Sequence, residues 1–377
     1  MKKVLVPRVR FKGFDDNWEQ GNIGEVFELT RGEVLSQRKI RNKKMGEYIY
    51  PVFSSQTLNN GLLGFYNNFL FKNSITWTTD GANAGTVLYR DGLFYATNVC
   101  GVMLQKTSIK PSSYFAHEIN VKVKKHVIKA GNPKLMINVL HEVLINFSKN
   151  KLEQEKISIL IENINNLITH EEIKLNKLKQ LKQTLLQKMF PEGNSKTPRI
   201  RFKGFSEEWK EDTIGNIAKV INGKSNTSDN NKWGQYNLYI RSEEIYKSNK
   251  YIFDVEGVIT VGDGNIGKIF HYVNEKFDLH QRCYLIYEFQ NIWPKYFYYY
   301  FSQNFYKRAI LMSYTATVNS IRMNTITDMD IMFPKEIIEQ QKIGDFFCKI
   351  DNIINLHQSK LNKLRQIKEA LLQKMFV

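Results

Sequence analysis

The sequence predicts an α+β protein with two similar mixed α/β lobes, separated by two long helices that form an antiparallel coiled coil. One observation is a duplicated helical segment, because residues 174–190 and 360–376 are identical at 13 of 17 positions. A second is a duplicated opening, PRVRFKGF at residues 7–14 and PRIRFKGF at residues 198–205. A third is a heptad spacing of apolar residues that runs into both copies of the helix. Together they predict an internal pseudo-twofold repeat, in which each lobe is followed by its own long helix.

The charge of the chain points to a polyanionic partner. Its 377 residues include 54 Lys and Arg against 37 Asp and Glu, which gives a formal net charge of +17. Nucleic acid is the first candidate for a partner of this kind. The alternative is a basic proteome, because Lys, Asn and Ile are used heavily throughout.

Cysteine usage and hydropathy indicate a soluble protein of the cytoplasm. The three cysteines, Cys100, Cys283 and Cys348, are far apart and form no CxxC pair, so we expect a reducing environment. The first ten residues lack the apolar region of a signal peptide. No run reaches the roughly 18 apolar residues that a membrane helix needs.

The duplicated segments set the domain boundaries. We expect the first lobe at residues 1–148, the first long helix at 149–190, a linker at 191–197, the second lobe at 198–334 and the second long helix at 335–377. In each copy the opening is followed by a Trp, an Ile-Gly pair and a further Gly at matching distances. These residues are Trp18, Ile23, Gly24 and Gly32 in the first copy, and Trp209, Ile214, Gly215 and Gly223 in the second.

Between these matching segments the two lobes diverge. Residues 33–79 and 224–262 share little sequence, and similarity returns at an Asp-Gly pair, Asp80-Gly81 and Asp263-Gly264. Two β-branched or aromatic runs then follow, separated by polar residues at 90–92 in the first lobe and at 274–275 in the second. We predict a hairpin in each lobe, with its turn at those polar residues.

A seam of apolar residues runs along each long helix. Residues seven or fourteen apart form this seam: Ile157, Ile164, Leu178 and Leu185 in the first helix, and Ile343, Ile350, Leu364 and Leu371 in the second. We assign its alternate positions to Leu160 or Ile161, Leu167 or Ile168 and Leu181, and to Phe346, Ile353 and Ile367. Glu171 and His357 interrupt the seam at its centre. A stripe this long needs a partner, which the other helix supplies; the alternative is that each helix packs back on its own lobe.

The chain carries no motif of a known active site. It lacks GxxxxGK[ST], HExxH, GxSxG and the Asn-Pro-Pro-aromatic or Asp-Pro-Pro-Tyr motif of amino-methyltransferases. Residues 262–267 match GxGxxG, but a strand pattern follows where a dinucleotide site needs a helix. We interpret residues 80–85 and 262–267 as tight loops, in which backbone can approach phosphate closely. We predict no catalytic residue, no metal site and no cofactor in this chain.

Basic residues cluster in the divergent part of each lobe. Lys and Arg attract phosphate, and Arg and Asn can also bind base edges. The predicted DNA-binding residues are Arg31, Arg38, Lys39, Arg41, Lys43, Lys44 and Asn83 in the first lobe, and Lys224, Lys232, Arg241, Lys247, Asn265 and Arg282 in the second. For any single residue a solvated surface charge is the simpler interpretation. Their shared location in both lobes is what favours a functional one.

Over residues 6–377 the chain resembles the DNA-specificity (S) subunits of type I restriction-modification systems. The features that match are the PRIRFKGF opening with its Trp and Ile-Gly, the Asp-Gly loop, the helix entry MFPKEIIEQQKIGDFF and the closing LNKLRQIKEALLQKMF. The first helix entry, NFSKNKLEQEKI, lacks the proline of the second. The presence of these features in two copies makes the resemblance specific.

The resemblance implies a division of labour. Each lobe would be a target-recognition domain for one half of a bipartite DNA sequence, and the coiled coil would set the spacer between the halves. The helices would dock two methyltransferase (modification) subunits, which bring S-adenosylmethionine and methylate adenine. Restriction subunits that use ATP and Mg would join them, and the chain itself would catalyse nothing. The alternatives are a coiled-coil scaffold for proteins alone, an enzyme with its own nuclease or methyl-transfer site, and a reader in another multisubunit restriction system.

Overall fold

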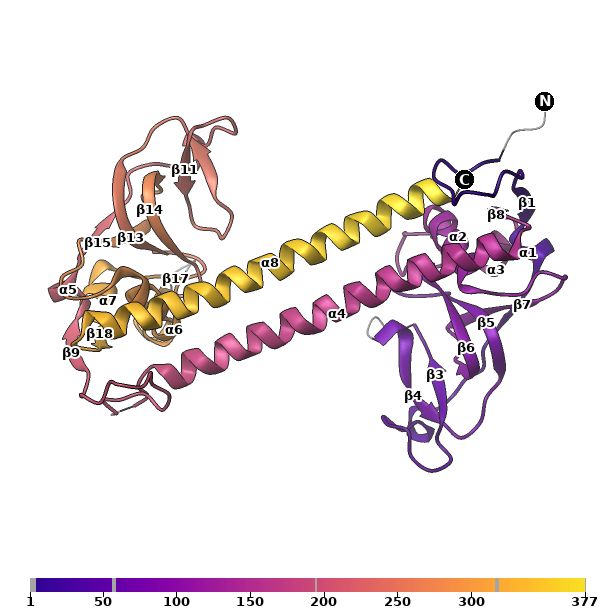
Figure 1. Cartoon of the computed structure of the whole chain (residues 1–377), viewed down its shortest axis with the longest axis horizontal. Helices are drawn as coiled ribbons and strands as arrows, with labels where there is room; N and C mark the ends of the chain where they lie inside the picture. Colours follow the sequence, from indigo (N-terminus) through magenta and orange to yellow (C-terminus); the bar gives the residue numbers. More distant parts are fainter. Residues whose placement is uncertain (1–4, 56–58, 194, 316–318, 377) are drawn as a thin grey trace. The chain divides into compact units, whose positions relative to one another are not determined.

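The computed structural model describes residues 5–55, 59–193, 195–315 and 319–376, which form two compact units (Figure 1). Unit 1 consists of Met1–His170 together with Leu361–Val377, and unit 2 consists of Glu171–Lys360. Each unit therefore combines one lobe with part of both long helices. Within the described residues, no helix is long and apolar enough to cross a membrane.

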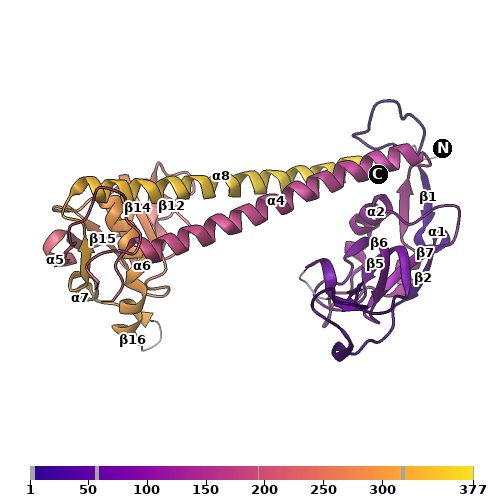
Figure 2. The ribbon, with the colours of Figure 1, turned by 60° about the horizontal axis from the view of Figure 1, so that its bottom comes forward.

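A six-stranded sheet with the order β2-β7-β5-β6-β3-β4 forms the body of unit 1. Only β3 and β6 run parallel; the other neighbours are antiparallel. Its strands are β2 (Phe27–Arg31), β3 (Tyr50–Phe53), β4 (Leu62–Tyr66), β5 (Phe71–Thr78), β6 (Val87–Ala96) and β7 (Cys100–Gln105). The remaining elements are β1 (Glu19–Asn22) paired with β8 (Leu144–Phe147), the helices α1 (Ile23–Val26), α2 (Ser113–Val123) and α3 (Ile137–His141), and the 3-10 turns Gln37–Lys39, Asn59–Gly61 and Lys124–His126. Figure 2 shows α2 beside β5 and β6.

Unit 2 repeats this plan with the strand order β10-β15-β13-β14-β11-β12. Its single parallel pair, β11 with β14, stands where β3 and β6 stand in unit 1. The strands are β10 (Lys219–Asn222), β11 (Tyr236–Tyr239), β12 (Tyr246–Ser248), β13 (Phe253–Val261), β14 (Phe270–Leu279) and β15 (Cys283–Tyr287). The remaining elements are β9 (Lys210–Thr213) paired with β18 (Asp330–Phe333), the short pair β16 (Tyr314–Thr315) and β17 (Asn319–Ser320), the helices α5 (Ile214–Ile217), α6 (Pro294–Leu311) and α7 (Met323–Thr327), and the 3-10 turn Thr227–Asp229.

The two divergent segments thus fold alike although they share little sequence. Residues 33–79 supply β3, β4 and β5, and residues 224–262 supply β11, β12 and β13 in the same places of the sheet. In both segments the last strand, β5 or β13, ends in a run of five buried residues. The predicted class, two similar α+β lobes with an internal repeat, is confirmed.

The predicted hairpin turns are wrong in both lobes. Residues 90–92 lie inside β6, and residues 274–275 lie inside β14. In β6 the irregularity is a bulge, where the Gly92 backbone N–H donates to the Asn73 side chain at 2.7 Å. Polar residues occur there because the distal part of each strand is solvated, and not because the chain reverses. The reversal comes earlier, at the Asp-Gly loop between β5 and β6 and between β13 and β14.

The long helices are α4 (Lys151–Met189) and α8 (Ile337–Met375). In unit 2 their segments run antiparallel, because Glu171 contacts His357 while Lys182, further along α4, contacts Asp351 at 2.5 Å. In unit 1 the start of α4 shares a core with the end of α8, through Ile157 and Met375. The predicted seam residues are all buried or half-buried.

The alternate positions of the seam differ in part from those that the sequence predicts. Leu181, Ile353 and Ile367 are 50%, 43% and 41% exposed. Ile161 and Ile168, two of the predicted residues, do occupy alternate positions of α4, and the others there are Leu175, Lys182 and Met189. The alternate positions of α8 are Phe347, Ile354, Leu361, Lys368 and Met375, and all of these residues are buried or half-buried. A heptad advances by four residues and then by three, so an apolar residue one place away competes for the same assignment. Two lysines occupy seam positions, which an apolar template cannot find.

Each lobe is fastened to a long helix by the same ion pair. The arginine of the duplicated opening binds the glutamate at the start of the helix through two hydrogen bonds. These are 2.6 and 2.9 Å for Arg10 with Glu153, and 2.7 and 2.8 Å for Arg201 with Glu339. Both glutamates are buried. The repeated motif RFKGF therefore supplies the arginine of this ion pair, and the repeated motif EQ(E/Q)KI supplies the glutamate.

Aromatic residues and a glycine complete the repeated framework. Trp18 packs edge-on against Tyr114 at 5.9 Å in unit 1, as Trp209 packs against Tyr296 at 5.8 Å in unit 2. The repeated glycine allows a close backbone approach, because a Cβ at Gly32 would lie 2.1 Å from the Ala96 carbonyl oxygen. Its counterpart in unit 2 is Gly223, where a Cβ would lie 2.2 Å from the Leu279 carbonyl oxygen.

Candidate nucleic-acid interface

Two arginines converge on one carboxylate beside the Asp-Gly loop of unit 2. The Arg241 Nη1 atom lies 3.2 Å from both carboxylate oxygens of Asp263, and the Arg282 Nε atom lies 4.0 Å from the second. Asp263 is buried, whereas the side chains of Arg241 and Arg282 are 47% and 65% exposed. A buried carboxylate that holds exposed guanidinium groups fixes their direction and leaves donors available to a ligand.

A neutral histidine supports the same pair. The Arg282 backbone N–H donates to Nδ1 of His280 at 3.0 Å. Burial lowers the pKa of His280, and the nearby Arg241 lowers it further. The imidazole is therefore uncharged at neutral pH and accepts this hydrogen bond, which orders the turn between β14 and β15.

Arg282 lines a hollow of about 340 Å³. Its wall is polar for the most part and includes Asn222, Gly262, Gln281, Arg282, Tyr284, Ser320 and Ile321. The loop itself is held by Gly264, whose backbone N–H donates to the Asn319 carbonyl at 2.9 Å. Asn265 stands exposed on this loop.

The predicted lysines of unit 2 lie elsewhere on the same lobe. Lys224, Lys232 and Lys247 are exposed, and Lys247 donates to the Asn237 side chain at 2.9 Å. Lys224 follows β10, next to Ser225, whose hydroxyl donates to the buried Asp278 at 2.6 Å. The structure thus brings Arg241, Arg282 and the loop of Asn265 together, whereas the lysines make their contacts with other groups.

In unit 1 the predicted basic residues form a different surface. Arg38, Lys39, Arg41, Lys43 and Lys44 are all exposed and follow one another around the 3-10 turn Gln37–Lys39. The Arg41 guanidinium lies 4.9 Å from the Tyr48 ring, and the Lys44 ammonium lies 5.6 Å from the Phe65 ring.

The Asp-Gly loop of unit 1 carries a different set of residues. Its Asp80 faces Lys134 at 3.8 Å, and Val99 stands where the alignment of the lobes places Arg282. Asn83 lies half-buried in this loop, and Arg31 is exposed at the end of β2. The two lobes therefore present different chemistry at the same place in the fold.

Sequence reasoning missed one prominent residue. Trp233 is 85% exposed, within a basic segment of unit 2, and the Lys232 ammonium lies 5.8 Å from its ring. An exposed aromatic ring beside a lysine is suited to stacking. The sequence signal was present in Lys232-Trp233-Gly234, but a Trp is more often assigned to the core.

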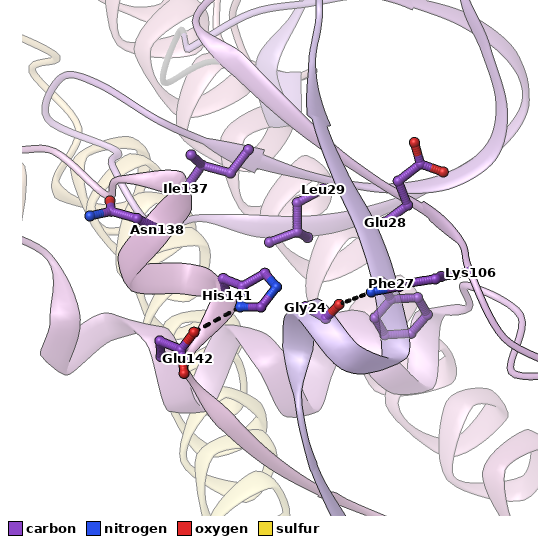
Figure 3. A pocket seen from close by; sticks show the side chains of 9 residues that line it. All are labelled: Gly24, Phe27, Glu28, Leu29, Lys106, Ile137, Asn138, His141 and Glu142. Carbon is purple, nitrogen blue, oxygen red and sulfur yellow. Dashed lines mark hydrogen bonds and ion pairs between the residues drawn. The ribbon is translucent and has the colours of Figure 1, made fainter.

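A second hollow lies in unit 1 away from these residues (Figure 3). It measures about 520 Å³, and its lining includes Gly24, Lys106, His141 and Glu142. The charged groups are occupied locally, because Lys106 donates to the Gly24 carbonyl at 2.7 Å and His141 pairs with Glu142 at 2.8 Å (Figure 3). None of the predicted DNA-binding residues lines it. Elsewhere in the described chain, no three His, Cys, Asp or Glu side chains gather as metal ligands would.

The outer faces of the long helices carry exposed apolar residues. On α4 they include Leu167 at 51% and Leu181 at 50%, and on α8 Leu356 at 70%. Single exposed apolar side chains are ordinary on a protein surface, whereas a contiguous patch of them marks a surface that binds another protein.

Two lobes of one topology, each with exposed basic residues and each joined to a long helix by the same contacts, define a protein built from a duplicated structural unit. The chain belongs to the type I restriction modification DNA specificity family, whose domain model matches residues 15–180 and again residues 206–366. The resemblance found in the sequence is thereby confirmed.

Three relatives illustrate the family. S.MpnORF289P of Mycoplasma pneumoniae, a sequence named for the N-terminus of a type I specificity subunit, is 39% identical over 142 residues, which are 37% of this chain and 74% of that one. The MpnII specificity subunit of the same organism is 33% identical over 43% of this chain and 46% of its own length. The EcoDI specificity subunit of Escherichia coli is 30% identical over 44% of this chain and 35% of its own length. This chain therefore spans less than half the length of the latter two relatives.

Solved structures agree with the fold. The crystal structure of a type I restriction-modification S subunit from M. genitalium matches with a TM-score of 0.75 and 17% identity, over 99% of both chains. A chain from a study of complex assembly in the type I R-M system matches with a TM-score of 0.54 and 15% identity, over 97% of this chain and 99% of that one.

Proposed function

We propose that this chain reads a bipartite DNA sequence for a type I restriction-modification complex, and that each lobe reads one half. The observation that supports this most is the duplicated family domain with a different set of exposed basic residues on each copy. Two lobes of one topology and unlike surface chemistry suit two unlike half-sites, because only the surface has to change when the target changes.

In unit 2 the reading element that we propose is the pair Arg241 and Arg282 on Asp263. A guanidinium group held by a carboxylate still presents N–H donors, and Arg binds the O6 and N7 atoms of guanine in the major groove. In unit 1 we propose Arg31, Asn83 and the exposed basic stretch at 38–44. The lysines of both lobes would bind phosphate, which gives affinity without sequence preference.

We further propose that the long helices serve as the spacer and as the docking surface for two methyltransferase subunits. The exposed leucines of α4 and α8 support the docking role. Methyl transfer from S-adenosylmethionine to adenine, and any cleavage driven by ATP and Mg, would belong to the modification and restriction subunits. The chain itself would contribute recognition in the cytoplasm and no catalysis.

The test is methylation by the chain reconstituted with its modification subunits. Adenine methylation mapped on a DNA library should reveal one split sequence, and a spacer one base pair longer should abolish it, because the added rise and twist displace one half-site. Unchanged methylation of the lengthened site would contradict the spacer role.

A second measurement separates DNA reading from the scaffold alternative. A DNA reader that contacts phosphates loses affinity steeply as salt increases, on a straight line in a log–log plot. A coiled-coil scaffold for proteins alone would assemble with the modification subunits and show no preference between the methylated sequence and a scrambled one.

A further inference from the structure

The seam between the long helices is nearly the same in both, apart from its centre. Ten positions of α4 from Ile157 to Met189 have counterparts 186 residues later, from Ile343 to Met375, and eight of the ten carry the same residue in both helices. One of the two differences, Ile161 against Phe347, exchanges one apolar side chain for another. The other is Glu171 against His357, where a carboxylate stands in one copy and an imidazole in the other.

These two unlike residues contact each other. The His357 Nδ1 atom lies 2.7 Å from the Glu171 carboxylate, and Lys360 pairs with the second oxygen of the same carboxylate. The Glu171 and His357 side chains are only 10% and 16% exposed. In an antiparallel pair of repeated helices, one position of each helix faces its own counterpart. Glu171 and His357 occupy that position.

This contact would be lost if two copies of the chain paired like helices with each other. If two copies of α4 paired with the same contacts, Glu171 would face Glu171, with Lys174 in the place of Lys360. If two copies of α8 paired, His357 would face His357, and Lys360 would have no carboxylate. The neighbouring position strengthens the contrast, because Glu172 has Gln358 as its counterpart. The centre of α4 is therefore acidic, and that of α8 carries no acid.

In two chains, pairing of like helices would lose two of the four contacts to the Glu171 carboxylates. Two mixed pairs hold four contacts to the Glu171 carboxylates, two from His357 and two from Lys360. One α4 pair together with one α8 pair would hold two, both between Glu171 and Lys174, and would add a like-charge contact between the two Glu171 carboxylates. Like charges opposite one another at a coiled-coil interface disfavour that pairing.

Two further sets of helix contacts do not discriminate between like and unlike pairs. The ion pair of Lys182 with Asp351 has the counterpart Lys368 with Asn165, so an α8 pair would hold two such ion pairs and an α4 pair none. Two mixed pairs also hold two in total. At the helix ends, Phe376 packs on Tyr114 at 5.5 Å and Phe190 packs on Tyr296 at 5.7 Å, so the same residue types meet in both units.

We infer that Glu171, His357 and Lys360 form a pairing element that makes each half of the chain select the unlike half. The surface is the centre of α4, and its partner is the repeat that carries His357 and Lys360, in the same chain or in a second copy. This inference does not rest on the proposed function, because neither DNA nor another subunit enters it.

The experiment uses the full chain, cut after it has folded. A protease site placed in the linker at residues 191–197 yields two halves that stay associated. Two such preparations are made. In one the C-terminal half carries an affinity tag, and in the other the C-terminal half carries a fluorophore. They are mixed and equilibrated in mild urea, so that the halves can exchange partners. We expect the tagged C-terminal half to capture N-terminal halves at least about tenfold better than labelled C-terminal halves, a preference of about 1.4 kcal/mol.

Substitutions at Glu171 and His357 test whether these two residues cause the selection of the unlike half. His357→Glu makes both centres alike, so capture between C-terminal halves should rise about tenfold, and Glu171→His should weaken the mixed pair. The double exchange, Glu171→His with His357→Glu, should restore selection of the unlike half. Asn355→Glu is the matched control, because it adds the same charge at an exposed position outside the seam. Equal capture of like and unlike halves by the unaltered protein would overturn the inference.

A measurement on uncut protein covers variants whose halves do not exchange. Each single exchange should lower the urea midpoint of the full chain, and the double exchange should recover most of that loss, because the pair is re-formed in the opposite order. Additive losses in the double variant would show that the two residues act independently, which contradicts a pairing element.

Discussion

Removing the buried glutamate at the start of α8 tests how each lobe is fastened to its helix. Glu339 accepts two hydrogen bonds from Arg201, at 2.7 and 2.8 Å, and the two side chains are 2% and 13% exposed. Glu339→Gln keeps the shape of the side chain but leaves the guanidinium without its counter-charge. Loss of one partner of a buried ion pair costs about 3–5 kcal/mol. We expect about 3 kcal/mol, because the amide oxygen can still accept one hydrogen bond.

The assay must resolve the two units separately. Amide hydrogen exchange does so, because it reports local opening element by element. Glu339→Gln should lower the protection of β9 and β18 in unit 2 and leave β1 and β8 in unit 1 unchanged. Glu153→Gln is the matched control and should do the reverse, because Arg10 and Glu153 make the same contact in unit 1. A loss below about 0.5 kcal/mol would refute the reasoning, since exposed ion pairs contribute that little.

The repeated glycines, a buried carboxyl group and two arginines each give a further prediction. Gly32→Ala and Gly223→Ala should each destabilise their own unit by about 2–3 kcal/mol in urea unfolding, because the new Cβ meets a backbone carbonyl that cannot move aside; Gly21→Ala, whose Cβ would make an ordinary 3.4 Å contact, should have little effect. Burial raises the pKa of Glu118 to about 7, so unit 1 should lose stability as pH rises from about 4.5 to 7, by up to about 3 kcal/mol. In this window the folded state holds the proton that the unfolded state releases, and Glu118→Gln should flatten the pH profile; an unchanged profile would show that another group titrates. Arg241→Ala should relax the methylated sequence in one half-site only and cost about 1–3 kcal/mol in binding, and Arg31→Ala should act on the other half-site; loss of both half-sites from one substitution would contradict separate reading.

The duplicated segments show what could be predicted from the sequence. The duplicated segments 174–190 and 360–376, which form the last turns of α4 and α8, are rich in Lys, Gln and Leu and free of Gly and Pro, so helical propensity and the heptad spacing identify them without tertiary information. The two-lobe plan was predicted from the repeat, because a segment that recurs at a constant offset indicates a duplicated structural unit. The tight loop after β5 and β13 was also predicted correctly, because the strand pattern that follows it excludes a dinucleotide site.

The hairpins and the site show what could not be predicted. Polar residues inside β6 and β14 look like turns in sequence, and only the neighbouring strands reveal that the chain continues through them. Arg241, Asp263 and Arg282 were each visible as charged residues, but they lie on three different connections of the sheet. Their convergence depends on the order β15-β13-β14-β11, which local propensity does not encode.

The sequence by itself determined the repeat, the helices and the positive charge, because these are properties of composition and of contacts between residues near in the chain. The tertiary structure alone decided which unlike residues meet: Arg10 with Glu153, Arg241 with Asp263, and Glu171 with His357. Such pairs join positions that are 22 to 186 residues apart. Their energies come from burial and from the fixed direction of side chains, and neither exists until the chain has folded.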